Sequence, residues 1–392
     1  IENMLFTIID YFIFCVIALY VLYNAYFTFY SFFPRTSKGK KHEASLQSFA
    51  VIFPAYKEDA VILDSVRKFL DQDYPQDRYK VIVVSDKMTD ETNRILSELP
   101  VKLLIPDFKQ SLKSKAIKFA LDRIEGYDKV IILDADNIVG KDFLKQVNNV
   151  SREDIALQLH RTWKNCNTSV AVWDAVAEEI NNTIYRKGHV NAGFSSAIIG
   201  SGIVFDFNWI KENIGKCTTF AEDKEMEVLL AKEGIFVNYG DKVYVYDEKT
   251  ATEKIFFGQR IRWAHSQTVV LASLLKAMKS GAINKNMVDK FFQWIPFPKQ
   301  IRFITAVLFA VIWSFVSFPV SVKWWSLIFL EMVIFAIAIP FEMYNRALFM
   351  SLLKLPVLIC VSVRSYVGAC IRMYRKDMSF NNTPHQNVSS DE

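Results

Sequence analysis

Two carboxylates separated by one residue stand directly after a short apolar run and could bind a divalent metal ion. Asp134 and Asp136 follow residues 130–133, which have the β-branched, apolar character of a buried strand. Side chains at i and i+2 of a strand point the same way, and the repulsion of two such carboxylates is relieved by a cation between them. Mg²⁺ or Mn²⁺ takes such ligands together with substrate phosphates. The pattern predicts a metal–diphosphate site, with a solvated acidic turn as the alternative.

A second acidic pair suits proton transfer. Glu222 and Asp223 stand at the start of a run of strong helix formers that ends near Lys232. Acidic residues at a helix start can simply complement the helix dipole. Alternatively, one carboxylate can act as a general base that removes a proton from an attacking hydroxyl.

Residues 259–263 (QRIRW) follow a loop and are predicted to open another helix. Arg262 offers a fork of donors that suits a diphosphate, and Trp263 offers a flat apolar face for a sugar. Both could also be ordinary helix-surface residues. Gly200 and Gly202, in a Gly/Ser-rich stretch, could allow close approach of a ligand, but a simple turn is the favoured interpretation.

The elements that must position these residues alternate between strand and helix. Strands are predicted at 49–54, 80–85, 101–105 and 130–133, with a helix after each of the first three. This order predicts an α/β fold with a mostly parallel sheet flanked by helices. Glu58, Asp86 and Asp134 follow three of the strands, and their meeting at one sheet edge would form a nucleotide-sugar pocket. Glu58 and Asp86 could also be loop residues or helix caps.

Composition separates a globular middle from apolar ends. Hydrophobic residues are 51% and aromatic residues 14% of the 392 residues, and the excess lies at the two ends. The five cysteines have no C-x-x-C spacing, which argues against a zinc site or a disulfide framework. The net charge of +5 is modest, and no nucleic-acid-binding module is recognisable. The absence of G-x-G-x-x-G disfavours a dinucleotide-binding fold.

The apolar ends predict membrane segments. Residues 1–33 form an N-terminal transmembrane helix, and the basic linker 34–47 places its end in the cytoplasm and the N-terminus outside. Near the other end, 276–302 reads as an interfacial segment and 303–346 as two transmembrane helices. Residues 347–376 could span the membrane, although an amphipathic helix on the inner face is favoured. A cytoplasmic tail, 377–392, contains Thr383 and His385, to which little function is assigned.

Six motifs occur in an order that resembles the membrane-embedded family 2 glycosyltransferases, a group that includes cellulose, chitin and hyaluronan synthases. They are PAYKE (54–58), SD (85–86), KSKAI (113–117), DAD (134–136), AED (221–223) and QRIRW (259–263). The resemblance covers about residues 48–275 and implies a GT-A-type fold. It departs from the family where T-E-D reads A-E-D and where K-x-x-A-L-N reads K-x-x-A-I-K.

The resemblance implies a role for each matching residue. The implied roles are Ala55, Tyr56 and Glu58 at the nucleobase, Asp86 at the uridine, Lys113 near the base or phosphates, Asp134 at the ribose, diphosphate or metal, Asp136 at the metal, Asp223 with Glu222 as the catalytic acid pair, and Gln259, Arg262 and Trp263 over the diphosphate and acceptor sugar. One base without a carboxylate nucleophile implies a single displacement with inversion.

The sequence therefore predicts a cytoplasmic catalytic domain over 48–275, anchored in a membrane, most plausibly the plasma membrane. It would transfer a sugar from a nucleotide donor, expected to be a UDP-sugar, to a growing β-linked polysaccharide, with Mg²⁺ or Mn²⁺. Transfer of one sugar to a membrane lipid is the alternative, and a non-catalytic scaffold or sugar-nucleotide sensor is a weaker one. So few spans make a polymer channel harder to build from one chain, which favours either the lipid alternative or assembly with a homo-oligomer or partner subunit.

Overall fold

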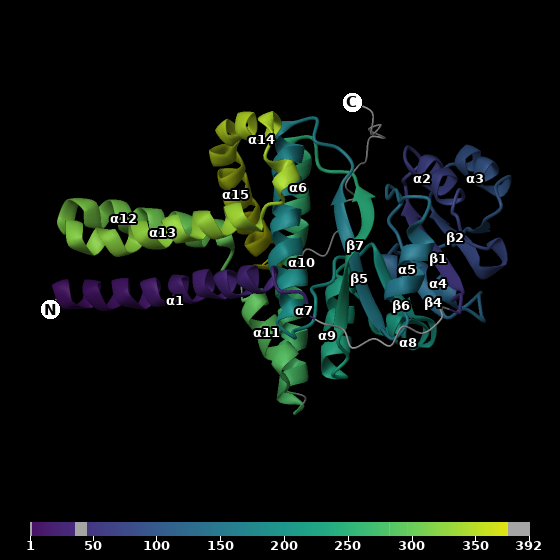
Figure 1. Ribbon diagram of the computed structural model, residues 1–392, viewed down its shortest axis with the longest axis horizontal. Coiled ribbons are helices and arrows are strands. Elements are labelled where there is room, and N and C mark those ends of the chain that lie inside the picture. The colour runs from purple at the N-terminus through teal and green to yellow at the C-terminus, as the bar shows by residue number, and fades with distance from the viewer. Residues whose placement is uncertain (1, 36–44, 282, 296, 375–392) are drawn as a thin grey trace.

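The computed structural model describes residues 2–35, 45–281, 283–295 and 297–374. A sheet wrapped by helices lies at one end of the molecule and long helices project from the other, with upright helices between them (Figure 1). Residues 38–41 of the predicted basic linker lie outside the described residues, and so do Thr383 and His385 of the predicted tail.

The sheet has seven strands in the order β3-β2-β1-β4-β6-β5-β7. Its strands are β1 (Phe49–Tyr56), β2 (Tyr79–Asp86), β3 (Lys102–Leu104), β4 (Lys129–Ile132), β5 (Ala156–Trp163), β6 (Ile203–Asp206) and β7 (Val237–Asp247). The first four strands pair in parallel, β6 runs antiparallel to both β4 and β5, and β7 is parallel to β5. The predicted mostly parallel sheet is confirmed.

Helices cover both faces of the sheet because the strand residues alternate between two cores. Phe49, Val51 and Phe53 pack with helices on one face, and Ala50 and Ile52 with helices on the other. The first face carries α2 (Ile62–Phe69), α3 (Asp90–Ser97) and α5 (Phe143–Val150). The second carries α4 (Lys113–Leu121), α8 (Phe207–Asn213) and α9 (Glu222–Lys232). Thr89 caps α3 by accepting a hydrogen bond from the Thr92 amide.

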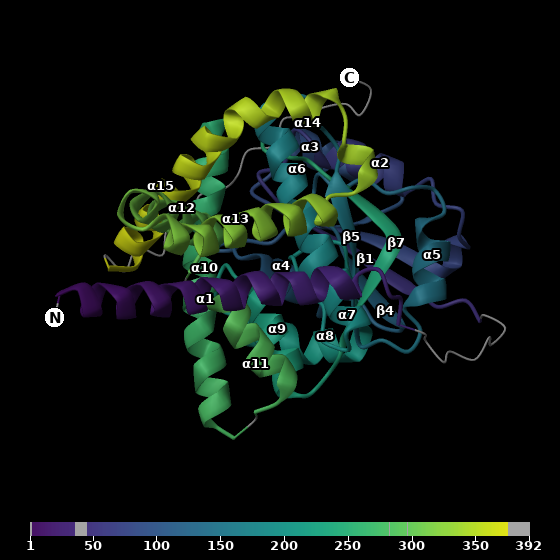
Figure 2. The same cartoon turned by 60° about the vertical axis from the view of Figure 1, so that its left-hand side comes forward.

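Upright helices separate the sheet from the projecting bundle (Figures 1 and 2). They include α6 (Ser169–Asn181), which continues as the π-helix η2 (Asn182–Gly188) and the short α7 (His189–Asn191), and also α10 (Glu253–Lys279) and α11 (Lys285–Trp294). A Cβ atom at Gly188 would lie 2.1 Å from the Phe27 carbonyl oxygen of α1 (Glu2–Tyr30). Only glycine therefore lets the π-helix contact the backbone of α1 at this point.

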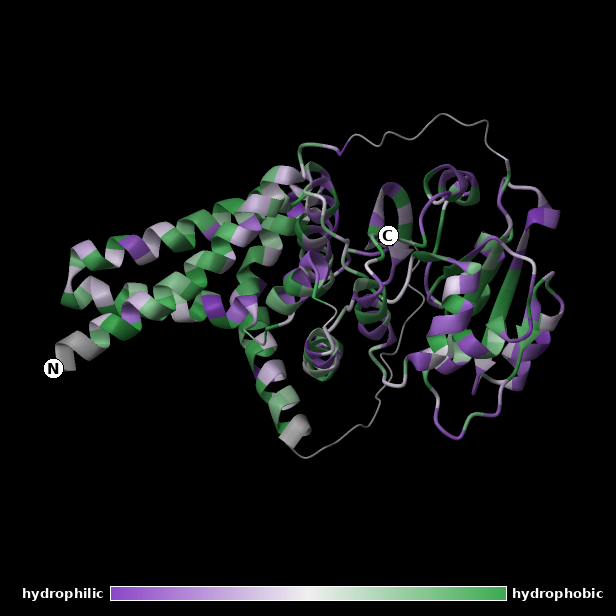
Figure 3. Ribbon diagram, turned by 90° about the horizontal axis from the view of Figure 1, so that it is seen from below, coloured by the Kyte–Doolittle hydropathy of each residue, from purple (hydrophilic) through white to green (hydrophobic). Residues whose placement is uncertain are grey.

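Four helices of the described chain are long and apolar enough to cross a membrane: 6–30 of α1, α12 (Lys299–Val316), α13 (Phe318–Ala338) and 346–371. The first three form the projecting bundle, which is mainly hydrophobic in Figure 3, whereas the helices around the sheet are largely hydrophilic. Asp10, the charged residue inside α1, is buried and accepts hydrogen bonds from the indoles of Trp313 (2.7 Å) and Trp324 (2.8 Å). Lys323 also pairs with it. The charge is thus matched inside the bundle, as an apolar surrounding requires.

The fourth apolar segment differs in direction from the other three. It comprises α14 (Arg346–Ser351), a 3₁₀ turn and α15 (Leu355–Tyr374). In Figures 1 and 2, α15 runs across the direction of α1, α12 and α13. It packs along α10, and its Ser365 hydroxyl donates to the Phe257 carbonyl at 3.3 Å.

Candidate active site

The carboxyl ends of β1 and β2 form one side of the candidate site. Tyr56 and Asp86 are register partners at these ends, and the Lys57 amide continues the ladder by donating to the Asp86 carbonyl at 3.2 Å. Ala55 is buried beside them, and the Glu58 amide donates to the Met88 sulfur at 3.1 Å. The predicted nucleobase residues therefore lie together at the sheet edge where α/β folds bind ligands.

The Asp134–Asp136 motif lies in a turn rather than on a strand. β4 ends at Ile132, and the Asn137 amide donates to the Asp134 carbonyl at 3.0 Å. The Asn137 side chain in turn accepts from the Asp134 amide at 2.9 Å. The strand alternation that was expected to aim both carboxylates alike does not extend to them. Asp136 instead accepts a hydrogen bond from the Glu248 amide at 2.8 Å, just after β7.

Lys113 joins three segments that are distant in sequence. From the first turn of α4, its ammonium pairs with Asp134, donates to the Gly200 carbonyl at 2.9 Å and lies 3.9 Å from Glu222. Burial would lower the pKa of Lys113, but Asp134 and Glu222 hold it above its usual value. The predicted phosphate-side lysine and both acidic motifs are therefore brought together.

Gly200 is a site residue, although the sequence analysis favoured a simple turn over close approach of a ligand at this position. Its φ is +54°, and a Cβ there would lie 3.6 Å from the Lys113 ammonium and 3.8 Å from Glu222 Oε1. The Gly200 backbone thus lies directly against the side chains of Lys113 and Glu222. Its place in a Gly/Ser-rich stretch was a signal for close approach, but many turns share that signal.

The acid pair begins α9, as predicted. Glu222 is buried, and burial together with the nearby Asp223 raises its pKa to about 8 against the opposing effect of Lys113. Glu222 therefore holds a proton near neutral pH, while the Asp223 side chain, half-buried, accepts from the Lys224 amide at 2.8 Å.

An ion pair fixes α9 to the helices on the bundle side. Glu227 of α9 pairs with Lys290 of α11 at 2.6 Å, and the adjacent Asp289 accepts a 2.6 Å hydrogen bond from Tyr23 of α1. Both carboxylates are buried. The helix that carries the acid pair is therefore tied through α11 to the apolar N-terminal helix.

The residues at 259–263 lie inside α10 instead of opening it. The helix begins at Glu253 because the Thr252 side chain caps it by accepting from the Ile255 amide. Burial lowers the pKa of Arg262, and the carboxylates of Glu222, Asp134 and Asp223 oppose this effect, so the guanidinium lies within range of the charges of both acidic motifs.

The other residues of this motif lie beside Arg262. Gln259 has a buried side-chain oxygen without a hydrogen-bond partner among the described residues. Trp263 is 38% exposed, and the Arg260 guanidinium lies 4.3 Å from its ring centroid. Trp263 is therefore held by a cation–π contact and remains partly exposed.

The carboxylate oxygens at this edge are suitable ligands for a hard divalent cation that is also coordinated by phosphates. Among the described residues, no group of three or more His, Cys, Asp or Glu forms a ready metal cage. Mg²⁺ needs only one or two carboxylates when substrate phosphates complete its shell. Asp86 Oδ1 adds a buried oxygen that has no hydrogen-bond partner among the described residues. Asp136 and Asp134 can supply these carboxylates, and Lys113 pairs with Asp134 in this structure.

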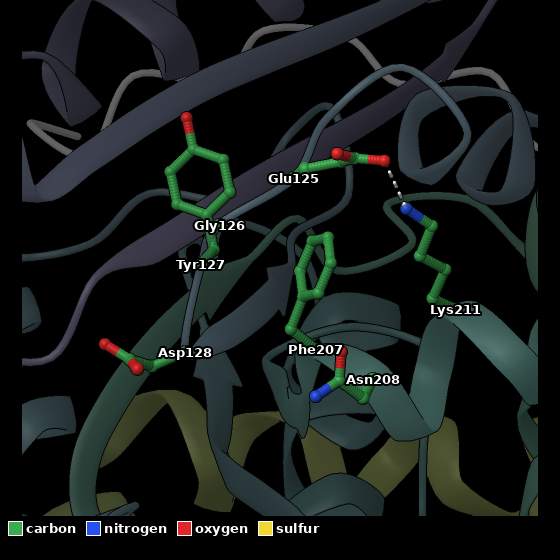
Figure 4. A pocket seen from close by; sticks show the side chains of 7 residues that line it. All are labelled: Glu125, Gly126, Tyr127, Asp128, Phe207, Asn208 and Lys211. Carbon is green, nitrogen blue, oxygen red and sulfur yellow. Dashed lines mark ion pairs between the residues drawn. The ribbon is translucent and has the colours of Figure 1, made fainter.

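A separate depression lies at the other end of β4 and contains none of the predicted site residues (Figure 4). Lys211 pairs there with Glu125 at 3.5 Å. The depression is lined by Glu125, Gly126, Tyr127, Asp128, Phe207, Asn208 and Lys211. It is distinct from the site described above.

Comparisons with known proteins identify the family of the chain. Residues 47–266 match the family described as "Glycosyltransferase like family 2". The chain is 24% identical over 270 residues to "Probable glycosyltransferase YdaM" of Bacillus subtilis, covering 66% of this chain and 63% of that protein. It is 29% identical over 228 residues to "Beta-monoglucosyldiacylglycerol synthase" of Synechocystis, covering 54% of this chain and 46% of that protein. The chain thus spans less than two thirds of either relative.

A solved structure shares the fold. The mannosyltransferase PcManGT from Pyrobaculum calidifontis, in complex with GDP-Man and Mn²⁺, gives a TM-score of 0.57 at 15% identity, covering 90% of this chain and 98% of that one. At this identity the likeness shows the fold alone. The family match covers more than half of the chain, and the protein therefore belongs to the family 2 glycosyltransferases.

Proposed function

We propose that the protein is a membrane-integrated, inverting glycosyltransferase that uses a nucleotide-sugar donor, with UDP-sugars as the preferred class. The observation that carries this proposal is the convergence of Lys113, Asp134 and Glu222 over Gly200, with Arg262 facing the same carboxylates. Such an arrangement can stabilise a leaving diphosphate on one side and hold acid–base groups on the other.

In this proposal the donor lies along the sheet edge. Tyr56, Ala55 and Glu58 surround the base, and Asp86 binds it. Lys113 and Arg262 take up negative charge on the leaving diphosphate, and Gln259 lies beside them. Asp136 and Asp134 would hold Mg²⁺ or Mn²⁺, which would supply Lewis-acid stabilisation to the same phosphates.

Proton transfer is assigned to the acid pair. Asp223 removes the proton from the attacking acceptor hydroxyl, and Glu222, protonated near neutral pH, lies beside it without competing as a second base. Because no carboxylate is assigned as nucleophile, one displacement inverts the anomeric carbon, so an α-linked donor gives a β-linked product. Trp263 provides the stacking face for the acceptor sugar.

The acceptor is proposed to be a growing polysaccharide. The exposed Trp263 face next to the diphosphate residues suits a saccharide acceptor. Transfer of one sugar to a lipid is the second candidate, supported by the Synechocystis relative, whose name describes a glycolipid synthase. The bundle of α1, α12 and α13 would anchor the enzyme with its N-terminus outside, and α15 would lie on the inner membrane surface.

Product sizing tests this proposal and separates the two acceptors. Purified protein in nanodiscs would be supplied with Mn²⁺ or Mg²⁺ and a panel of UDP- and GDP-sugars, and nucleoside-diphosphate release and product length would be measured. Metal-dependent release with a polymeric product is expected. Single-sugar lipid products would overturn the polysaccharide assignment, and no release with any donor or lipid extract would overturn the transferase assignment.

A further inference from the structure

Two lysines hold one buried carboxylate of α9, the helix that begins with the acid pair. Glu227 Oε2 accepts a hydrogen bond from Lys224 Nζ at 2.8 Å, and Glu227 Oε1 lies 2.6 Å from Nζ of Lys290 in α11. The side chains of Glu227 and Lys290 are each 1% exposed. Burial would raise the pKa of Glu227, but the two lysines hold it below its usual value. The carboxylate is therefore ionised near neutral pH and keeps both partners.

The same two lysines hold the backbone that leads to Gly200. The Lys224 ammonium donates to the Ile198 carbonyl at 2.7 Å. The Lys290 ammonium donates to two carbonyls of the same segment at 3.5 Å and 3.4 Å, those of Ser195 and Ser196. Because both ammonium groups also contact the buried carboxylate, α9 and residues 195–198 are joined at one point.

α11, which carries Lys290, is itself fixed to other elements. Its Asp289 accepts the 2.6 Å hydrogen bond from Tyr23 of α1. The Asn284 side chain caps α11 and also donates to the Ala231 carbonyl of α9 at 2.6 Å. Lys290 therefore attaches α9 to a helix that is held in place from the side of α1.

The start of α9 depends on such attachment because no side chain caps it. Ala221 occupies the N-cap position and forms no side-chain cap. Helix ends fray, and an uncapped end does so more readily. Glu227 follows Asp223 by four positions, so the two side chains lie on the same face of the helix. The ion pair with Lys290 thus acts one turn away from the proposed base.

A displacement of α9 would be felt directly at the site. Lys113 lies 3.9 Å from Glu222 of α9 and donates to the Gly200 carbonyl at 2.9 Å. The two segments that Lys224 and Lys290 join are therefore the two that meet at the Lys113 ammonium.

We propose that Lys290, acting through Glu227, is a positioning residue for proton transfer: it holds the first turn of α9 where Asp223 reaches the acceptor hydroxyl. The inference rests on the proposed function, because it takes Asp223 as the base. It adds to the reaction a residue that lies outside all six sequence motifs and is too deeply buried to touch the substrates.

Replacement by methionine tests the assignment in the full-length protein. Lys290→Met keeps the side-chain length and leaves Glu227 paired with Lys224, so no buried carboxylate loses its last partner. Nucleoside-diphosphate release would be measured in nanodiscs with Mn²⁺, per calorimetrically titrated nucleotide-binding site. We expect kcat to fall by up to about a hundredfold, the cost of misplacing a catalytic group by about 1 Å. The affinity for the released nucleoside diphosphate should be nearly unchanged, and a proportional loss of this affinity would overturn the assignment.

Lys323→Met is the matched control. Lys323 also pairs with a buried carboxylate, that of Asp10, which keeps the indole donors of Trp313 and Trp324 when the lysine is lost. This pair lies in the projecting bundle (Figure 1), and the control should keep the wild-type kcat. Equal losses of kcat in Lys323→Met and Lys290→Met would overturn the assignment, because the loss of any buried ion pair would then have the same effect.

A double-mutant cycle separates positioning from general support of the fold. If Lys290 acts through Asp223, Lys290→Met should have almost no further effect once Asp223→Asn has removed the base. A general loss of structure would lower kcat by the same factor in both backgrounds, and that result would overturn the assignment. If Lys290→Met does not fold, Glu227→Gln/Lys290→Met takes its place in the cycle, because it removes the buried carboxylate together with its partner.

These measurements distinguish failure of this inference from failure of the proposed function. An active wild type and a Lys290→Met variant with the same kcat overturn the positioning role alone. Full turnover in Asp223→Asn overturns the base assignment and this inference with it, while the transferase assignment stands. A wild type that releases no nucleoside diphosphate from any donor overturns the proposed function as well.

Discussion

Two neighbouring groups of charged residues are satisfied in different ways. At the candidate active site, the cations Lys113 and Arg262 face the carboxylates of Asp134, Glu222 and Asp223, and Glu222 is too poorly compensated to ionise near neutral pH. Behind it, between the sheet and α10, lies a buried ion network in which each charged side chain has an opposite charge within 4 Å. This network comprises Arg161, Asp174, Glu178, Arg186, Asp247, Lys249 and Arg260.

The difference distinguishes residues that maintain the fold from residues that are available for binding and catalysis. In the network, Glu178 lies 2.9 Å from Arg161 and 3.0 Å from Arg186, and these cations hold its pKa far below its usual value despite burial. Arg260, fixed by Asp174, also holds Trp263 in place. Each charge of the network therefore has an opposite charge from the protein itself, although the Nε atoms of Arg161, Arg186 and Arg260 have no hydrogen-bond partner among the described residues. At the candidate site, by contrast, burial keeps the Glu222 carboxyl from ionising near neutral pH despite the nearby Lys113. Incomplete compensation of this kind is typical of functional sites.

The largest effect should come from the acid pair, where we expect a substitution to lower the turnover rate without reducing the stability of the fold. Asp223→Asn removes the proposed base while keeping the side-chain size. We expect turnover to fall by about 10²–10⁴-fold, with donor affinity nearly unchanged because Asp223 acts on the acceptor. Initial rates of nucleoside-diphosphate release and calorimetric donor binding would measure both. Glu212→Gln, on the exposed side of α8, is the control; full turnover in Asp223→Asn would remove Asp223 as the base.

The converse result is expected in the buried ion network. Glu178→Gln leaves Arg161 and Arg186 as buried cations without their main carboxylate, and breaking such a pair costs about 3–5 kcal/mol. We expect a lower melting temperature and reduced yield of folded protein. Because the folded-state pKa of Glu178 is depressed, its contribution to stability is present above the unfolded pKa and is lost as pH falls through the folded value. A variant as stable as the wild type at pH 7 would show that the network does not contribute to the scaffold.

The sequence predicted the elements that depend on local pattern. Strands β1, β2 and β4 lie where buried apolar runs were recognised, because alternation and β-branching are properties of neighbouring residues. The start of α10 was placed too late, at Gln259, since the capping Thr252 lies in a stretch with no apolar periodicity. The turn at Asp134 was taken for the continuation of a strand because the carboxylates follow β4 so closely.

What the sequence could not predict are contacts set by the topology. Lys113 meets the Gly200 carbonyl across 87 positions, and Arg161 meets Glu178 only because α6 crosses β5 with one particular register. Motif order indicated that Lys113, Asp134 and Glu222 belong to one site, but not that a single ammonium joins them. No motif indicated the buried ion network, and the sequence analysis singled out none of its charged pairs.

A pH titration would sharpen the comparison by measuring the uncompensated carboxyl directly. Since the pKa of Glu222 is raised to about 8, the folded protein keeps a proton that the unfolded chain loses near its ordinary value. The free energy of unfolding should therefore decrease as pH rises from the ordinary pKa of a glutamate, 4.5, to the raised pKa of about 8. The decrease is at most about 1.4 kcal/mol per pH unit. Glu222→Gln should remove this dependence, so that its melting temperature relative to the wild type is higher at pH 8 than at pH 5. A constant difference across this range would contradict the raised pKa.

The smallest effect expected is at Gly200, and a paired substitution isolates it. Gly200 and Gly126 both have positive φ, +54° and +80°, so alanine costs a similar backbone strain of about 1–2 kcal/mol at either position. A Cβ at Gly126 meets no described heavy atom within 4 Å, whereas one at Gly200 contacts the Lys113 ammonium and Glu222. Both variants should therefore lose similar stability, but only Gly200→Ala should also lose turnover, by several-fold, because the new methyl group contacts both the Lys113 ammonium and the Glu222 carboxyl. Equal turnover in the two alanine variants would mean that a methyl group at position 200 does not disturb the reaction and that the position of Lys113 is not critical for it.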